Sequence, residues 1–124
     1  MKKKILIVED DSVLQSALMD CFSKEDYDVL VSSNVMDAFR QIEDKKPDII
    51  LTDLIMANLN GFEILKRIKD NAHLNDIPVI VMSNSGQEKD VKDAMSLGAK
   101  DFLLKANLSL KEIVKRVNKV ASKS

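Results

Sequence analysis

Residues 49–52 form a run of apolar and β-branched side chains that shows no alternation and has polar residues on both sides. A strand without a polar face is buried on both sides, which is typical of a parallel sheet covered by helices. The run ends at Asp53, and ligands of open α/β sheets lie just beyond the carboxyl ends of the strands. Asp53 is therefore a candidate functional residue.

Four other apolar runs along the chain alternate with segments of helical periodicity. The five predicted strands are 4–8, 27–31, 49–52, 77–83 and 100–104. Each predicted helix opens with a Ser or Asn cap followed three residues later by Glu, Gln or Asp. These pairs are Ser12 and Gln15, Asn34 and Asp37, Asn60 and Glu63, Ser85 and Glu88, and Ser109 and Glu112. The alternation predicts an α/β fold of three layers, a (βα)5 doubly wound parallel five-stranded sheet with right-handed crossovers.

Length and charge exclude several classes of protein. The chain has 124 residues, which predicts one domain over 1–124 without an output domain. Its 19 basic and 20 acidic residues give a net charge of -1, which argues against nucleic acid or a membrane as the main partner. No apolar run approaches ~18 residues, so no membrane span is predicted. The single cysteine, Cys21, forms no internal disulfide, which fits a reducing cytoplasm.

Polar residues stand at the carboxyl ends of four of the predicted strands and would meet at one edge of a parallel sheet. They are Glu9, Asp10, Asp53, Ser83 and Lys105. Carboxylates at such close range repel one another unless a cation lies among them. An oxygen-only set without His or Cys favours Mg²⁺, Mn²⁺ or Ca²⁺ over zinc, and Mg²⁺ pairs most readily with phosphate. Lys105 and Ser83 add groups that can neutralise phosphoryl oxygens.

Five motifs together resemble the receiver domain of two-component response regulators. They are Ile-Leu-Ile-Val-Glu-Asp-Asp at 5–11, Asp-Ile-Ile-Leu-Thr-Asp-Leu at 48–54, Asn-Gly-Phe-Glu at 60–63, Val-Ile-Val-Met-Ser at 79–83 and Gly-Ala-Lys-Asp-Phe-Leu-Leu-Lys at 98–105. The resemblance covers the whole chain. It implies a flavodoxin-like sheet with the strand order 2-1-3-4-5.

The resemblance also implies a phosphorylation-dependent signalling switch rather than an enzyme. Asp53 would accept a phosphoryl group from a phosphohistidine of a histidine kinase or phosphotransfer protein. Glu9, Asp10, Asp53 and the backbone carbonyl of Ile55 would hold Mg²⁺, and Lys105 would bind the phosphoryl oxygens.

The response to phosphorylation would come from a switch pair, Ser83 and Phe102. Movement of Ser83 toward the phosphoryl group would let the ring of Phe102 turn inward. This would change the face made by the fourth helix, fifth strand and fifth helix, where an unknown downstream protein binds. A monomer is expected, with phosphorylation-induced dimerisation as the alternative.

Three other classes of protein fit these residues less well. A phosphatase with an aspartate nucleophile needs a second Asp two residues later, where Ile55 stands. A degenerate receiver that binds partners without phosphorylation would lack the acceptor, a metal carboxylate or the lysine, and all are present. No Gly-x-Gly-x-x-Gly follows a strand, which disfavours a dinucleotide site.

Several residues near these motifs have ordinary structural interpretations. The acidic run at 9–11 alone would be a solvated turn, and Asp11 is expected to serve the helix start. Phe102 alone fits a simple core position equally well, and the six methionines occupy positions typical of a core. Ala106 stands where the family usually has proline, so the Lys105–Ala106 peptide bond is predicted to be trans.

Overall fold

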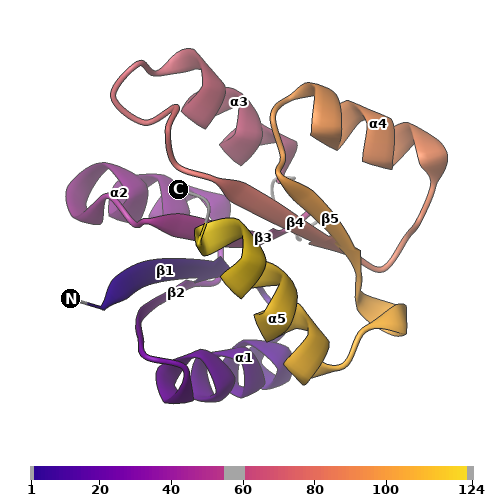
Figure 1. Cartoon of the computed structure of the whole chain (residues 1–124). Helices are drawn as coiled ribbons and strands as arrows, with labels where there is room; N and C mark the ends of the chain where they lie inside the picture. The colour runs from indigo at the N-terminus through magenta and orange to yellow at the C-terminus, as the bar shows by residue number, and fades with distance from the viewer. Residues whose placement is uncertain (1, 55–60, 123–124) are drawn as a thin grey trace.

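The computed structural model describes residues 2–54 and 61–122, in which five strands alternate with five α-helices (Figure 1). The strands are β1 (Lys3–Val8), β2 (Tyr27–Ser32), β3 (Ile49–Asp53), β4 (Val79–Ser83) and β5 (Asp101–Leu104). The helices are α1 (Ser12–Lys24), α2 (Val35–Lys45), α3 (Phe62–Asp70), α4 (Glu88–Ser96) and α5 (Leu110–Ala121), and a 3-10 turn, η1 (Lys105–Asn107), precedes α5. The predicted strands at 77 and 100 begin one or two residues too early.

The sheet has the order β2-β1-β3-β4-β5, and all four strand pairs are parallel. This confirms the predicted doubly wound, flavodoxin-like α/β fold. The chain moves from β1 outward to β2, then returns to the other side of β1 for β3. The carboxyl ends of β1 and β3 are therefore neighbours at the switch point of the sheet, where such folds bind ligands.

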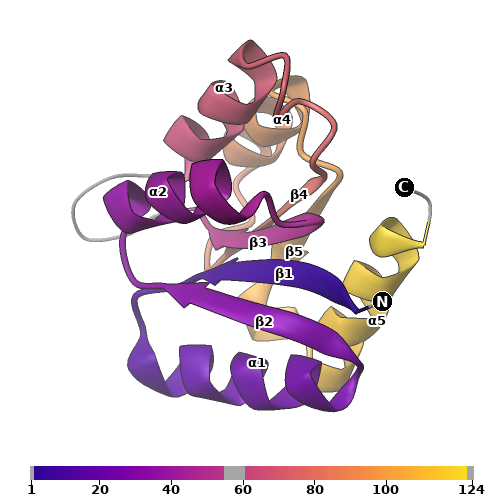
Figure 2. The same ribbon diagram turned by 90° about the vertical axis from the view of Figure 1, so that its left-hand side faces the viewer.

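Two hydrophobic clusters fill the space between the sheet and its two helical layers. Figure 2 shows α1 and α5 on one face of the sheet and α2, α3 and α4 on the other. Alternate residues of β1 supply the two clusters: Leu6 and Val8 pack toward α2, α3 and α4, whereas Ile5 and Ile7 pack toward α1 and α5. All four side chains are fully buried, and burial of each contributes about 1.5 to 3 kcal/mol.

The start of α1 differs from the predicted capping box. Asp11 is the N-cap, and its carboxylate accepts hydrogen bonds from the backbone N–H groups of Val13 and Leu14 at 2.9 and 3.2 Å. Ser12 is already inside the helix, so its predicted pairing with Gln15 is wrong. A carboxylate is favoured here because it accepts two N–H groups and complements the positive end of the helix dipole. The expected role of Asp11 at the helix start is confirmed.

The start of α4 is the second correction. The helix begins at Glu88 after Gln87, which makes no side-chain capping bond. Ser85 lies one turn earlier, where its hydroxyl accepts a hydrogen bond from the N–H of Gln87 at 3.4 Å. The predicted Ser85 and Glu88 cap is therefore wrong.

Two predicted caps are confirmed. Asn34 accepts a hydrogen bond from the N–H of Asp37 at 2.8 Å, and Ser109 and Glu112 form a reciprocal capping box. Asn60, predicted to cap α3, lies outside the described residues.

Two predictions concern the peptide bond after Lys105 and the absence of a membrane-spanning segment. Among the described residues no peptide bond is cis, which confirms the predicted trans bond between Lys105 and Ala106. Within residues 2–54 and 61–122, no helix has the length and apolar character that crossing a membrane requires.

Candidate phosphoacceptor and metal site

Lys105 lies between two buried carboxylates at the carboxyl edge of the sheet. Its Nζ is 2.7 Å from Oε1 of Glu9 and 3.0 Å from Oδ2 of Asp53. The side chains of Glu9 and Asp53 are 0% and 9% exposed, and that of Lys105 is 13% exposed. Residues at the carboxyl ends of β1, β3 and β5 therefore share one site, as parallel strands require.

Three carboxylates form the acidic side of this site. One carboxylate oxygen from each of Glu9, Asp10 and Asp53 lies within 4.8 Å of the other two. Glu9 and Asp53 are buried, whereas Asp10 is exposed. Such a spacing lets one small cation contact all three groups, and hard oxygen ligands without nitrogen or sulfur match Mg²⁺ or Ca²⁺. The donor set therefore fits the predicted magnesium ion.

The backbone holds the first of these carboxylates from several directions. The N–H of Glu9 donates to the carbonyl of Ser32 at 3.0 Å, one step beyond the last register pair of β1 and β2. The carboxylate of Glu9 uses Oε1 for Lys105 and accepts the N–H of Asp11 on Oε2 at 3.0 Å. Glu9 is therefore fixed both along its backbone and at its carboxylate.

The central aspartate has an unusual acidity. Burial is the main reason that the pKa of Asp53 is raised from 3.8 to about 6. The hydrogen bond from Lys105 lowers this pKa, and the negative charge of Glu9 raises it. Burial lowers the pKa of Lys105, but its hydrogen bonds to Glu9 and Asp53 outweigh burial and leave that pKa above 10.5. At neutral pH Asp53 is therefore mostly ionised and lies beside the ammonium group of Lys105.

Replacement of Asp53 by Asn is expected to stabilise the protein in the absence of Mg²⁺, by about 2 kcal/mol at pH 7. Because the pKa of Asp53 is raised to about 6, the folded state favours the protonated carboxyl. The stabilisation from the protonated Asp53 carboxyl is complete below the pKa of Asp53 in the unfolded chain, near 3.8. It is lost as pH rises through the folded-state pKa of about 6. Urea unfolding at several pH values measures this difference.

The same experiment has two internal controls. The advantage of Asp53→Asn should vanish below about pH 4, and it should shrink when Mg²⁺ is added, because the ion binds the wild-type carboxylates. A difference that does not depend on pH would show that the charge of Asp53 is not its cause.

The two predicted switch residues lie on neighbouring strands. Ser83 ends β4, is 3% exposed and accepts the N–H of Ser85 on its hydroxyl at 3.0 Å. Phe102 lies on β5 opposite Val81 and packs, partly buried, against the cluster beneath α2, α3 and α4. The structure thus places Ser83 at the same sheet edge as the acidic group. Ile55, whose carbonyl was predicted to bind the metal, lies outside the described residues.

Sequence reasoning missed Gly61. Its N–H donates to the carbonyl of Leu54, and a Cβ at this position would collide with the backbone oxygen of Asp53 and lie 3.0 Å from Cα of Leu54. Only glycine lets the start of α3 approach the end of β3 so closely. The available signal was the glycine directly after the predicted cap Asn60, within the motif at 60–63.

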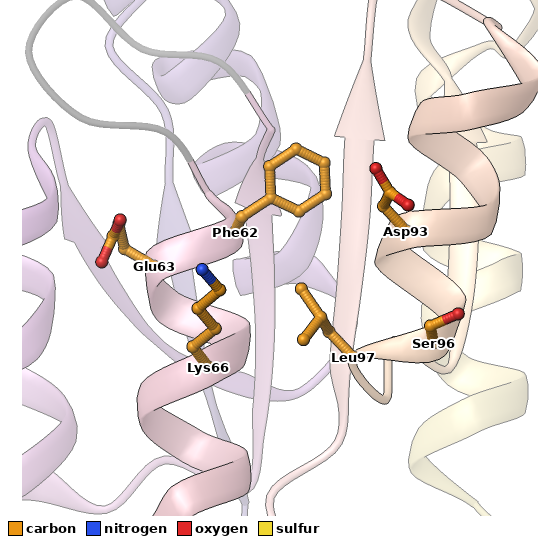
Figure 3. A pocket seen from close by; sticks show the side chains of 6 residues that line it. All are labelled: Phe62, Glu63, Lys66, Asp93, Ser96 and Leu97. Atoms are coloured by element: carbon orange, nitrogen blue, oxygen red, sulfur yellow. The ribbon is translucent and has the colours of Figure 1, made fainter.

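A separate groove lies between α3 and α4 and has a volume of about 400 Å³ (Figure 3). Phe62 and Leu97 reach into the space between the two helices, and Lys66 and Asp93 lie on opposite walls. Glu63 and Ser96 complete the lining, so none of the residues of the acidic site contributes to this groove. Its charges are mixed, and it does not extend the acidic site.

Comparison with known proteins identifies the family. The model of the response regulator receiver domain matches residues 5–118. The chemotaxis protein CheY of Thermotoga maritima is 34% identical over 125 residues, which cover 98% of this chain and 99% of CheY. The phosphate regulon transcriptional regulatory protein PhoB of Pseudomonas aeruginosa is 31% identical over 118 residues, which cover 95% of this chain and 51% of PhoB. The chain thus spans about half the length of PhoB but nearly all of CheY.

A solved structure shows the same fold. The signal receiver domain of a putative LuxO repressor protein from Vibrio parahaemolyticus superposes with a TM-score of 0.91 at 25% identity, over 99% of this chain and 92% of that one. The family match extends over nearly the whole chain and agrees with the sheet order and the acidic edge. The chain belongs to the family of response regulator receiver domains of two-component systems.

Proposed function

We propose that this receiver domain is a phosphorylation-dependent switch in which Asp53 accepts a phosphoryl group from a phosphohistidine. The donor is a histidine kinase or a phosphotransfer protein, and the reaction takes place in the cytoplasm. The observation that carries the proposal is the buried Asp53 carboxylate, 3.0 Å from the ammonium group of Lys105 and within a cluster of three carboxylates.

The transfer uses Asp53 as a carboxylate nucleophile. One of its oxygens attacks the phosphorus, the new O–P bond forms as the P–N bond to the histidine breaks, and the imidazole nitrogen leaves with the electron pair. The nucleophile must be ionised, and a pKa of about 6 leaves Asp53 mostly ionised at neutral pH. Lys105, which already contacts Asp53, is positioned to donate to oxygens of the transferring group.

Glu9, Asp10 and Asp53 would hold Mg²⁺, with the carbonyl of Ile55 as a further ligand that the family resemblance implies. When bound, the ion supplies positive charge that offsets the negative charge of the transferring group. The ionised carboxylates of the chain provide the acidic side of the site, and Lys105 provides a cation that stays attached to the protein.

The signal would leave the site through Ser83 and Phe102. The hydroxyl of Ser83 accepts an N–H from Ser85 and can still donate its own hydrogen to a phosphoryl oxygen. Phe102 is only partly buried, and in the proposed switch its ring would turn from an outer to an inner position beside β4. The inner position would alter the face of α4, β5 and α5, where a downstream protein would bind. The receiver itself would be a monomer.

Intact mass after incubation with Mg²⁺ and acetyl phosphate tests this proposal. We expect the wild-type protein to gain one phosphoryl group, and Asp53→Asn to gain none. Removing Mg²⁺ with a chelator should suppress the gain. A wild-type protein that gains no phosphoryl group, or an Asp53→Asn variant that gains one as readily, would overturn the assignment of Asp53 as the acceptor.

A further inference from the structure

Gln15, in the first turn of α1, reaches back to the ends of two strands. Its side-chain Nε2 is 3.0 Å from the carbonyl oxygen of Glu9, 3.2 Å from the carbonyl oxygen of Ser32 and 3.3 Å from the hydroxyl of Ser33. An amide nitrogen carries two hydrogens, so it can serve both carbonyls at once. Gln15 therefore bridges the segments that follow β1 and β2.

This bridge continues the pairing of β1 and β2 past its last register pair, Val8 and Ser32. The carbonyl of Ser32 accepts the N–H of Glu9 from the backbone and the amide of Gln15 from the side chain. Both backbone polar groups of Glu9 are thereby held: the N–H by Ser32 and the carbonyl by Gln15.

The carbonyl of Glu9 belongs to the peptide bond that leads into Asp10. Because a peptide unit is planar, fixing this carbonyl also fixes the direction in which the chain enters Asp10. Asp10 is the exposed member of the acidic cluster, so burial does little to orient it. The backbone that Gln15 holds is therefore one determinant of where the Asp10 carboxylate lies.

We propose that Gln15 is a positioning residue that sets the Glu9–Asp10 peptide so that the three carboxylates can share one divalent cation. The consequence for phosphorylation rests on the function proposed above. Gln15 does not touch the reacting atoms, and it acts through the backbone of Glu9.

The chain offers a matched control in Gln41. This glutamine, on α2, is also half-buried, and its Nε2 donates to the carbonyl of Val31 at 2.9 Å and to Asp37 at 2.8 Å. Replacement of Gln41 by Met removes a comparable hydrogen bond from a side-chain amide to a backbone carbonyl near the end of β2, the strand that ends at Ser32. It does not touch Glu9.

The test compares Gln15→Met and Gln41→Met with the wild-type protein. Titration with Mg²⁺, followed by calorimetry, should give a dissociation constant about tenfold higher for Gln15→Met, in the range typical for loss of an outer support of a metal ligand. Gln41→Met should stay within about twofold of the wild type. The rate of labelling by acetyl phosphate should recover in Gln15→Met at saturating Mg²⁺, because the nucleophile and Lys105 are unchanged.

Equal Mg²⁺ affinity in the two variants would overturn the positioning role and leave Gln15 with a purely structural one. A loss of saturated rate without a change in Mg²⁺ affinity would overturn it as well. Hydrogen exchange of the Glu9 and Asp11 amides in the absence of Mg²⁺ gives a measurement that does not depend on phosphorylation.

These two amides should exchange faster in Gln15→Met than in Gln41→Met, because they donate to Ser32 and to the carboxylate of Glu9. If the wild-type protein binds Mg²⁺ but does not become phosphorylated, the proposed function fails, and the Mg²⁺ titration together with this exchange comparison still decides the positioning role. Equal exchange rates in the two variants would then overturn it. A wild-type protein that binds no Mg²⁺ would overturn the positioning role as well.

Discussion

Replacement of Lys105 by Met is expected to lower the free energy of unfolding by about 3 kcal/mol at pH 7 in the absence of Mg²⁺. The variant keeps Glu9 and Asp53 buried but removes the ammonium group that lies 2.7 and 3.0 Å from them. Two uncompensated carboxylates then repel each other inside the protein. Urea unfolding measures the loss, and labelling by acetyl phosphate should slow by about 100-fold.

The loss from Lys105→Met should depend on pH. The hydrogen bond from Lys105 lowers the pKa of Asp53, so its removal raises that pKa further above about 6. Stability is retained while Asp53 is protonated and is lost as pH rises through this raised value, so the deficit is largest at neutral pH and smaller near pH 5. Mg²⁺ should restore part of the stability.

Lys92 supplies the control for Lys105→Met. Its side chain is 76% exposed, and its ammonium lies 4.0 Å from Glu88, so Lys92→Met should change stability by less than about 0.5 kcal/mol. If Lys105→Met were as stable as Lys92→Met at neutral pH, Lys105 would not be the counter-charge of the buried carboxylates.

Replacement of Gly61 by Ala should have the second large effect, a loss of about 1 to 3 kcal/mol. The new Cβ would meet the backbone oxygen of Asp53 and the Cα of Leu54, which are parts of a fully buried strand end that cannot swing aside. Relief of the collision must move the end of β3 or the start of α3. We therefore expect slower labelling of Asp53 as well as lower stability.

Gly86 is the matched control for this substitution. A Cβ at Gly86 would lie 3.4 Å from Cδ2 of Leu104, an ordinary contact with the end of a flexible side chain. Gly86→Ala should therefore leave unfolding and labelling nearly unchanged. If Gly61→Ala were equally mild, the close approach of α3 to Asp53 would have no energetic importance.

The architecture could be predicted because it depends on patterns that repeat along the chain. All five residues of β3 are buried, as an apolar run without alternation requires, and the parallel order brings its last residue to the common edge. Asp53 and Lys105 meet there because Asp53 ends β3 and Lys105 directly follows β5. The positions of Asp53 and Lys105 depend on where β3 and β5 end, and the apolar runs in the sequence predict these ends.

Details that depend on contacts between distant segments could not be predicted in the same way. Gln15 has the right spacing for a capping box with Ser12, and only the proximity of Ser32 shows its actual partners. Asp11 and Ser12 are adjacent residues that can both cap a helix, and the sequence does not show which of the two precedes the first helical residue. Met36, expected in the core, is 65% exposed, because it follows the buried Val35 by one step around the helix.

The bridge between Lys105 and its two carboxylates joins residues that the ribosome adds at different times. Glu9 and Asp53 precede Lys105 by 96 and 52 residues. A ribosome that adds about 5 to 20 residues per second needs about 3 to 10 s to pass from the aspartate to the lysine. Until then the nascent chain holds acidic groups without their lysine, so burying them together is disfavoured. The paired site thus forms only after translation has passed β5 and added Lys105.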